Sequence, residues 1–221
     1  MKSWIFSDSH SHHGFINVPK DIDLAIFAGD CGTVRDPYMN ANGVRDFLEW
    51  YNSLEIKFKI FVAGNHDTSI ERGLVDPKQY PSIIWLNHES TVIEGIKIFG
   101  SPFQPSFGDG WAYNVKRAKL HDYWKDIPTD TDILITHGPP YGILDLTESG
   151  EAKLQHVGCS SLFKRIKAIE PKFSIFGHIH NESEGINSGI FKPTGMKTTF
   201  INACVVDLRY ELVNDGIVIE I

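Results

Sequence analysis

The sequence predicts a layered α/β fold with a mixed β-sheet. Three observations lead to this prediction. Short apolar runs that end in small and polar residues recur five times, segments with the apolar spacing of a helix lie between them, and glycine-containing turns adjoin apolar runs. Strands that alternate with helices, together with hairpins, favour layered α/β architectures.

The five apolar runs predict strands. Each run is short and continuous, as expected of a strand that is buried on both faces. A glycine directly follows three of the runs, where it permits a sharp turn and the close approach of a ligand to the backbone. The predicted strands span residues 3–6, 24–28, 59–63, 132–136 and 173–176.

Helices and hairpins are predicted between and after these strands. Apolar side chains recur at helical spacing in residues 41–54 and 160–170, and Pro171 is expected to end the second helix. A further helix is predicted over residues 115–125. The turns at Glu94-Gly95 and Asp215-Gly216 predict two hairpins, the second of them near the C-terminus.

Composition restricts the class of protein. The 221 residues suit one domain, which we predict to span residues 1–221, and a hydrophobic fraction of 42% is typical of a globular chain. Lys and Arg number 21 and Asp and Glu number 28, which gives a formal net charge of −7. This charge argues against a general nucleic-acid binder, but it leaves open an enzyme that neutralises phosphate with metal ions.

The cysteines and the apolar segments indicate a compartment. Cys31, Cys159 and Cys204 are far apart and form no CxxC pair, so we expect neither a disulfide framework nor a zinc ribbon. The N-terminal apolar run is too short for a signal peptide, and no apolar stretch approaches the roughly 20 residues that span a bilayer. We therefore expect a cytoplasmic protein without a membrane partner.

Metal-binding residue types gather directly after the five predicted strands. Any one of them has a simpler explanation, such as turn chemistry for Asp and Asn or a surface position for His. Ligands bind at the carboxyl ends of strands in such sheets, so the five loops converge if the strands are parallel neighbours. The residues are Asp8, His10, Asp30, Asn65, His66, His137, His178 and His180.

Two divalent metal ions explain this choice of residues. A pair of ions about 3.5–4 Å apart can hold the attacking and leaving oxygens of a phosphoryl displacement. One carboxylate must bridge the ions, and we assign this role to Asp30. Mixed oxygen and imidazole ligands suit Mn, Fe, Zn or Ni better than Ca, and a bridging water then becomes hydroxide near neutral pH.

These blocks resemble the calcineurin-like metallophosphoesterase superfamily. They are Asp8-x-His10, Gly29-Asp30, Gly64-Asn65-His66-Asp67, Thr136-His137-Gly138-Pro139-Pro140 and Gly177-His178-x-His180. Ser101-Pro102-Phe103-Gln104-Pro105 and Gly110-Trp111-Ala112-Tyr113-Asn114 further resemble the subfamily of metallophosphoesterase-domain-containing proteins. The resemblance implies a four-layer α/β/β/α sandwich with mixed sheets and a dimetal site at the carboxyl ends of the strands.

The resemblance also implies a role for each residue. The first metal takes Asp8, His10, Asp30 and His180, and the second takes Asp30, Asn65, His137 and His178. His66 contacts a phosphate oxygen and protonates the leaving alkoxide. Asp67 either holds the His66 ring in the useful tautomer or caps a turn or helix. Mn is the first choice of metal, with Fe, Zn, Ni or Mg as alternatives.

The substrate is predicted only by class. A phosphodiesterase that acts on small diesters such as cyclic nucleotides leads, and a phosphomonoesterase or a non-catalytic binding scaffold is the alternative. His12 is a candidate phosphate contact beside Asn65 and His66. Phe103, Phe107, Trp111 and Tyr113 form either a packed loop or a platform for a nucleobase. We expect no stable nucleic-acid complex, and the oligomeric state is open.

Overall fold

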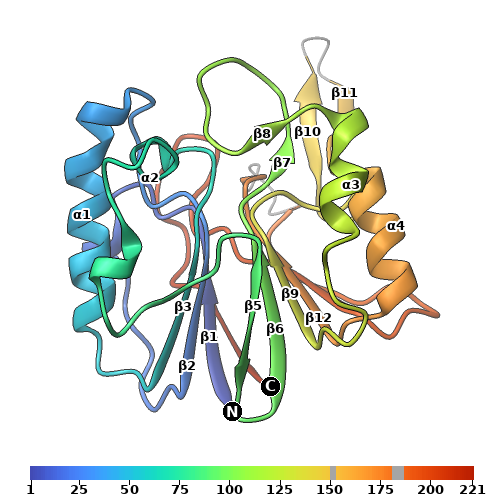
Figure 1. Ribbon diagram of the computed structural model, residues 1–221, viewed down its shortest axis with the longest axis horizontal. Coiled ribbons are helices and arrows are strands. Elements are labelled where there is room, and N and C mark those ends of the chain that lie inside the picture. Colours follow the sequence, from blue (N-terminus) through green and yellow to red (C-terminus); the bar gives the residue numbers. More distant parts are fainter. Residues whose placement is uncertain (150–152, 181–186) are drawn as a thin grey trace.

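Two mixed β-sheets pack against each other, and helices cover the outer face of each sheet, which gives four layers (Figure 1). The structure is a computed structural model that describes residues 1–149, 153–180 and 187–221. The predicted α/β fold with its α/β/β/α layers is confirmed.

The first sheet has the order β15-β1-β2-β3-β4. Strands β1 to β4 run parallel, and only β15 is antiparallel to its neighbour. Three of the predicted strands therefore lie side by side in this sheet. The bounds are β1 Lys2–Phe6, β2 Leu24–Ala28, β3 Phe58–Val62, β4 Ile84–Trp85 and β15 Ile217–Glu220.

The second sheet has the order β13-β14-β12-β9-β6-β5. Its four central strands are parallel, and both edge strands are antiparallel to their neighbours. The bounds are β5 Glu89–Ile93, β6 Ile96–Ser101, β9 Ile133–Thr136, β12 Phe173–Phe176, β13 Gly189–Phe191 and β14 Thr199–Asn202. Two short pairs lie outside the sheets, namely β7 Gln104–Pro105 with β8 Asn114–Val115, and β10 Leu146–Ser149 with β11 Lys153–His156.

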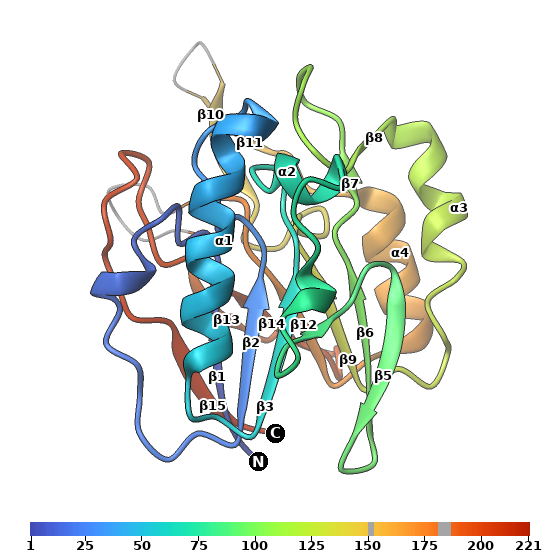
Figure 2. The same cartoon turned by 60° about the vertical axis from the view of Figure 1, so that its left-hand side comes forward.

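The helices divide between the two outer faces (Figure 2). Helix α1 (Pro37–Ser53) and the short α2 (Thr68–Glu71) cover the first sheet, and α3 (Leu120–Trp124) and α4 (Ser160–Ile169) cover the second. Three 3₁₀ turns complete the fold, at η1 His13–Phe15, η2 Pro77–Gln79 and η3 Arg117–Lys119. No helix in the described ranges has the length and apolarity needed to cross a bilayer.

Local signals explain where the helices begin and end. Helix α1 starts four residues before the predicted segment, because the Asp36 side chain accepts hydrogen bonds from Tyr38 N and Met39 N and Pro37 takes the first turn. Helix α4 ends at Ile169, where Glu170 adopts a left-handed conformation. The predicted helix over 115–125 divides into η3 and α3.

The hairpin at Glu94-Gly95 is confirmed, and the one at Asp215-Gly216 is wrong. Strands β5 and β6 pair antiparallel with Ile93 opposite Ile96. Strand β15, which follows Gly216, pairs with β1 at the other end of the chain. Ile217 and Ile219 pack there against the apolar cluster between the sheets, so tertiary packing outweighs the local turn signal.

Three apolar clusters fill the spaces between the four layers. The middle cluster combines side chains of both sheets, such as Ile26 of β2 and Ile135 of β9. The outer clusters pack Phe47 of α1 against the first sheet and Leu162 of α4 against the second. Since the parallel strands of both sheets end at one edge, their polar loops face each other there (Figure 1).

Candidate metal centre

Several loop residues at this edge have left-handed backbone conformations. The φ angles are 55° at Asp8, 39° at His10, 64° at Asp30 and 69° at His178. L-residues other than glycine rarely adopt such angles, and they do so mainly where function or tight packing requires it. The turns after the strands are therefore bent so that these side chains meet at the edge where the parallel strands of both sheets end.

The first group of donor atoms joins His10 to His180. Their Nε2 atoms lie 3.1 Å apart, and His180 Nε2 lies 3.6 Å from Asp8 Oδ1. His10 Nδ1 donates to Gly32 O, and His180 Nδ1 donates to Asp207 O. Because a carbonyl oxygen only accepts hydrogen bonds, both rings keep Nε2 for the site.

The second group surrounds His137. Its Nδ1 donates to Ala28 O, and its Nε2 lies 3.0 Å from Asn65 Oδ1. The ring of His178 lies 5.0 Å away, measured between ring centroids, and the ligating atoms of His137, His178 and Asp30 all lie within 4.8 Å of one another. This group contains every residue predicted for the second metal.

Asp30 lies between the two groups. Its Oδ2 atom is 3.3 Å from His137 Nε2 and 4.0 Å from His10 Nε2, while its Oδ1 accepts a hydrogen bond from His66 N. The carboxylate is almost completely buried. One oxygen thus faces both groups of donors, which is the placement expected of a bridging ligand.

Both carboxylates are ionised despite their burial. Burial acts to raise the pKa of Asp8, but the hydrogen bond with His180 and the charge of His137 lower this pKa to about 2. Burial likewise acts to raise the pKa of Asp30, and the charge of His137 holds that pKa well below its ordinary value. Asp8 and Asp30 are therefore available as oxygen ligands at neutral pH.

Among the four histidines of the two groups, the pKa is lowered for two and raised for the other two. Burial lowers the pKa of His10 to about 4, and burial with the charge of His137 lowers the pKa of His178 to about 3. Burial also acts to lower the pKa of His137, but the charge of Asp30 raises it to about 9. The pKa of His180 is raised against burial by its hydrogen bond with Asp8.

This set of donors fits divalent metal ions. In each group, imidazole lone pairs and carboxylate or amide oxygens converge on one position, so the atoms repel one another unless a cation lies among them. The raised pKa values of His137 and His180 reflect the same need for positive charge beside the carboxylates. Mixed nitrogen and oxygen ligands with carbonyl partners on Nδ1 are typical of borderline transition-metal sites.

His66 lies beside both groups of donor atoms, and a backbone carbonyl on the side away from the site holds its ring. Nδ1 donates to Thr33 O, which leaves Nε2 for the site. The ring lies 4.6 Å from that of His10 and 4.3 Å from that of Trp111, measured between centroids. A ligating atom of His66 also lies within 4.8 Å of those of His10 and Asp30, so its role as a proton donor rather than a ligand stays a prediction.

Asp67 does not contact the His66 ring, and the prediction that it sets the tautomer of that ring is wrong. Its carboxylate accepts hydrogen bonds from Gly64 N and from three amides of the loop after β2. It makes no side-chain cap at α2 either. His66 Nδ1 donates to Thr33 O instead of to Asp67. The buried Asp67 carboxylate is needed as the acceptor for these four amides.

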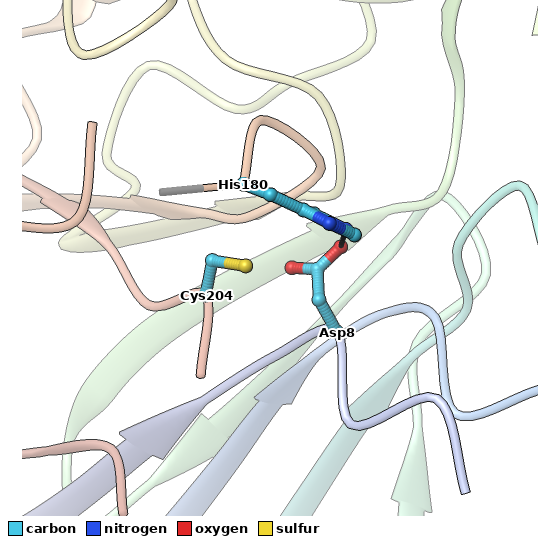
Figure 3. A group of neighbouring side chains, drawn as sticks. All are labelled: Asp8, His180 and Cys204. Carbon is cyan, nitrogen blue, oxygen red and sulfur yellow. Dashed lines mark ion pairs between the residues drawn. The ribbon is translucent and has the colours of Figure 1, made fainter. Parts of the chain in front are cut away.

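Sequence reasoning missed two neighbours of the centre. Figure 3 shows Asp8 between the ring of His180, with which it forms an ion pair, and the thiol of Cys204. Burial and the charge of Asp8 raise the pKa of the Cys204 thiol, so it stays protonated. The ring of Tyr210 lies 4.7 Å from that of His10. Neither residue belongs to a motif, and no local signal marks them.

A central cavity of about 230 Å³ opens over the centre. Four of the predicted ligands line it together with His66, and aromatic and aliphatic side chains form its rim. His12 does not line this cavity, and its ring lies nearest to that of Phe15. The lining residues are Asp30, Asn65, His66, Phe107, Trp111, Leu146, Thr147, His178, Ile179, His180, Leu208 and Tyr210.

The structure divides the predicted aromatic cluster. Tyr113 is buried, and Phe103 packs with it against the core. Phe107 and Trp111 instead lie at the central cavity, where the Phe107 ring is 5.1 Å from that of His178. The packed-loop interpretation therefore applies to Phe103 and Tyr113, and a platform for a nucleobase stays a prediction for Phe107 and Trp111.

Comparison with known proteins decides the family. A family model described as calcineurin-like phosphoesterase matches residues 1–182. The chain belongs to the calcineurin-like phosphoesterase family. The resemblance found in the motifs is thereby confirmed, and membership implies hydrolysis of phosphate esters at a centre of two divalent metals.

Relatives within the calcineurin-like phosphoesterases cover almost the whole chain. Metallophosphoesterase domain-containing protein 1 of Homo sapiens and that of Mus musculus are each 33% identical to it, over 97% of this chain and 69% of theirs. A solved crystal structure with 16% identity matches 92% of this chain and 90% of its own with a TM-score of 0.68, which supports the fold.

Proposed function

We propose that this chain is a metal-dependent phosphodiesterase that acts on small diesters such as cyclic nucleotides. The observation that carries the proposal is the position of Asp30, whose Oδ2 faces His137 on one side and His10 on the other. Two clusters of donors that share a carboxylate at the floor of a cavity are typical of two-metal phosphoesterases.

We assign the candidate ligands to two metals as the motifs predict. Asp8, His10 and His180 would hold one ion, Asn65, His137 and His178 the other, and Asp30 would bridge them. Bound there, divalent ions supply Lewis-acid stabilisation of the charge on phosphate oxygens. Manganese is our first choice, because carboxylate and carbonyl oxygens suit it and Asp8, Asp30 and Asn65 offer such oxygens.

His66 is proposed to protonate the leaving oxygen. Its Nδ1 is occupied by Thr33 O, so Nε2 is the atom that can hold a proton toward the cavity. The ring is wedged between His10 and Trp111, which fixes its direction. General acid catalysis needs this combination of a free nitrogen and a fixed ring.

The wall of the central cavity favours a diester over a monoester. Neither Lys nor Arg is among the described residues that line it. A phosphomonoester brings two negative charges at neutral pH and a diester only one, so a wall of aromatic, aliphatic and imidazole side chains suits the diester. The same lack of basic side chains argues against long nucleic acids.

A reducing compartment such as the cytoplasm remains our prediction for the location. Cys31, Cys159 and Cys204 are all free and buried. Buried thiols behave as small apolar side chains and need no oxidising environment. Cell fractionation with an antibody against the chain would test this assignment.

The proposed activity is tested with two chromogenic esters on chelator-treated protein to which manganese is returned. We expect manganese-dependent cleavage of bis(p-nitrophenyl) phosphate, weaker cleavage of p-nitrophenyl phosphate, and loss of both in Asp30→Ala. Cleavage of the monoester alone would make the chain a phosphomonoesterase. Lack of cleavage with Mn, Fe, Zn and Ni would leave a metal-binding scaffold.

A further inference from the structure

A second cavity opens beside the central one. This side cavity has a volume of about 250 Å³ and shares four wall residues with the central cavity, namely Phe107, Thr147, His178 and Ile179. Each cavity is smaller than the roughly 300–1,000 Å³ of pockets that hold a whole small molecule, whereas the two together reach that range. They therefore have the form of two compartments of one binding site.

The two compartments differ in chemistry. The central cavity contains the donors around Asp30, while the remaining wall of the side cavity is mainly apolar. Its one cationic residue among those described, Arg117, already donates to Gly158 O and Val157 O. The other residues that line it alone are Pro105, Gly138, Pro139, Val157 and Gly158. An uncharged, flat group fits the apolar part of this wall.

Phe107 forms the boundary between the compartments. It is 52% exposed, although a phenylalanine gains stability from burial, and its ring lies 5.1 Å from His178 and 6.2 Å from Trp111 between centroids. An exposed aromatic ring beside a predicted metal ligand can stack against another ring. The prolines and glycines of the opposite wall leave room for a flat group.

We propose that the side cavity binds a planar aromatic ester group of the substrate, an aryl group or a nucleobase, while the phosphate lies in the central cavity. The inference rests on the proposed function, since it places the phosphate over the same residues. Phe107 and Val157 are then specificity-determining residues. A substrate with only small alkyl ester groups leaves the side cavity without a partner.

Calorimetric titration of manganese-loaded protein with phenylphosphonate and methylphosphonate, which have no ester bond to cleave, tests the proposal without relying on turnover. The two probes share a phosphonate group, which stands in for the phosphate, and differ in the ring. We expect phenylphosphonate to bind about tenfold more tightly, because only its ring removes apolar surface of the cavity from water. In Phe107→Ala, and in Val157→Phe, which fills the cavity, this ratio should fall to about twofold or less.

Phe191→Ala is the matched control, since Phe191 is a half-exposed phenylalanine on β13, outside both cavities. It should keep the ratio of the parent chain. Equal affinities in the parent chain, or an unchanged ratio in both cavity variants, would overturn the side-cavity proposal while the diesterase assay can still succeed. If neither probe bound and no ester were cleaved, the proposed function would be overturned as well.

Discussion

Backbone carbonyls determine which nitrogen three of the predicted histidine ligands offer to the site. Gly32 O, Ala28 O and Asp207 O accept from the Nδ1 atoms of His10, His137 and His180. The rings are thereby held in one orientation with Nε2 directed at the site, so little reorganisation of the side chains is needed on binding. The imidazole donors are therefore preorganised for metal.

His66 provides the first prediction at the scale of single residues. His66→Ala should keep its metals, because the two groups of predicted ligands remain intact. Turnover should fall by about 10²–10⁴-fold, most strongly for esters with poor leaving groups, since the proton donor is lost. Metal content by mass spectrometry and a series of leaving groups test this. A metal-free His66→Ala protein would instead identify His66 as a ligand.

The sequence predicts which residues lie at the centre far better than it predicts which groups they form hydrogen bonds with. The strand-end loops carry their candidate ligands in short motifs, so Asp8, Asn65 and His137 can be assigned from the motifs and the family resemblance. The environment of Asp67 could not be predicted in this way, because three of its four amide partners lie some 35 residues earlier in the chain. Tyr210 reaches the cavity only through the fold of the second half of the chain.

At the scale of elements, Asp67 ties the loop after β2 to the loop after β3. Four backbone amides and the Cys31 thiol donate to one fully buried carboxylate. Asp30 is among the residues whose amides are held, so the position of this proposed bridging ligand depends on the contact. The loops are thus fixed to each other at the floor of the centre.

Asp67→Asn should destabilise the protein without removing any predicted ligand. The introduced amide group presents N–H donors to backbone N–H groups, which leaves buried donors unpaired. We expect a loss of about 2–4 kcal/mol in the free energy of unfolding, measured by urea denaturation of the metal-free protein. Asp76→Asn, which alters a cap of the exposed turn η2, is the control and should cost less than about 1 kcal/mol. A similar loss of unfolding free energy in Asp67→Asn and Asp76→Asn would contradict the role of Asp67 in joining the two loops.

Gly64 supplies a second prediction at this scale. A Cβ atom there would collide with Asp30 Oδ1 and lie 2.5 Å from Asp30 N, whereas Gly14 has open space around it. Gly64→Ala should therefore displace Asp30 and abolish ester cleavage, while Gly14→Ala keeps it. Parallel assays of both variants, with circular dichroism to verify folding, test this. An active Gly64→Ala protein would show that the loop can move aside.

Helix and strand positions were predictable where the signal is local. The apolar spacing from Val44 to Leu54 predicts the body of α1, and the cap at Asp36 explains its earlier start. Strand β15 was misassigned because its partner, β1, is more than 200 residues away in the chain. A turn signal such as Asp215-Gly216 cannot identify so distant a partner.

At the scale of the whole molecule, the centre joins the two sheets. Asp8, His10 and Asp30 follow strands of the first sheet, and His137, His178 and His180 follow strands of the second. His178 N donates to both oxygens of Asp8 across this boundary. Ligand binding at the centre should therefore stabilise the packing of one sheet on the other.

Metal binding should accordingly raise the stability of the whole chain. At a free metal concentration 100 times the dissociation constant we expect about 2.7 kcal/mol of added stability, visible as a higher Tm in scanning calorimetry. Asp30→Ala should lose most of this gain, since neither ion keeps its shared ligand. A Tm that is independent of manganese in the parent chain would contradict the assignment of the centre.

The division of the ligands between the sheets has a consequence for biosynthesis. A ribosome releases Asp8, Asp30 and Asn65 long before His137, His178 and His180, and the strand that completes the first sheet comes last. Stalled nascent chains that stop before residue 130 should hold no tightly bound metal, because each ion would lack its ligands from the second sheet. Metal capture then marks the end of folding rather than its start, and immature chains do not compete for the cellular metal supply.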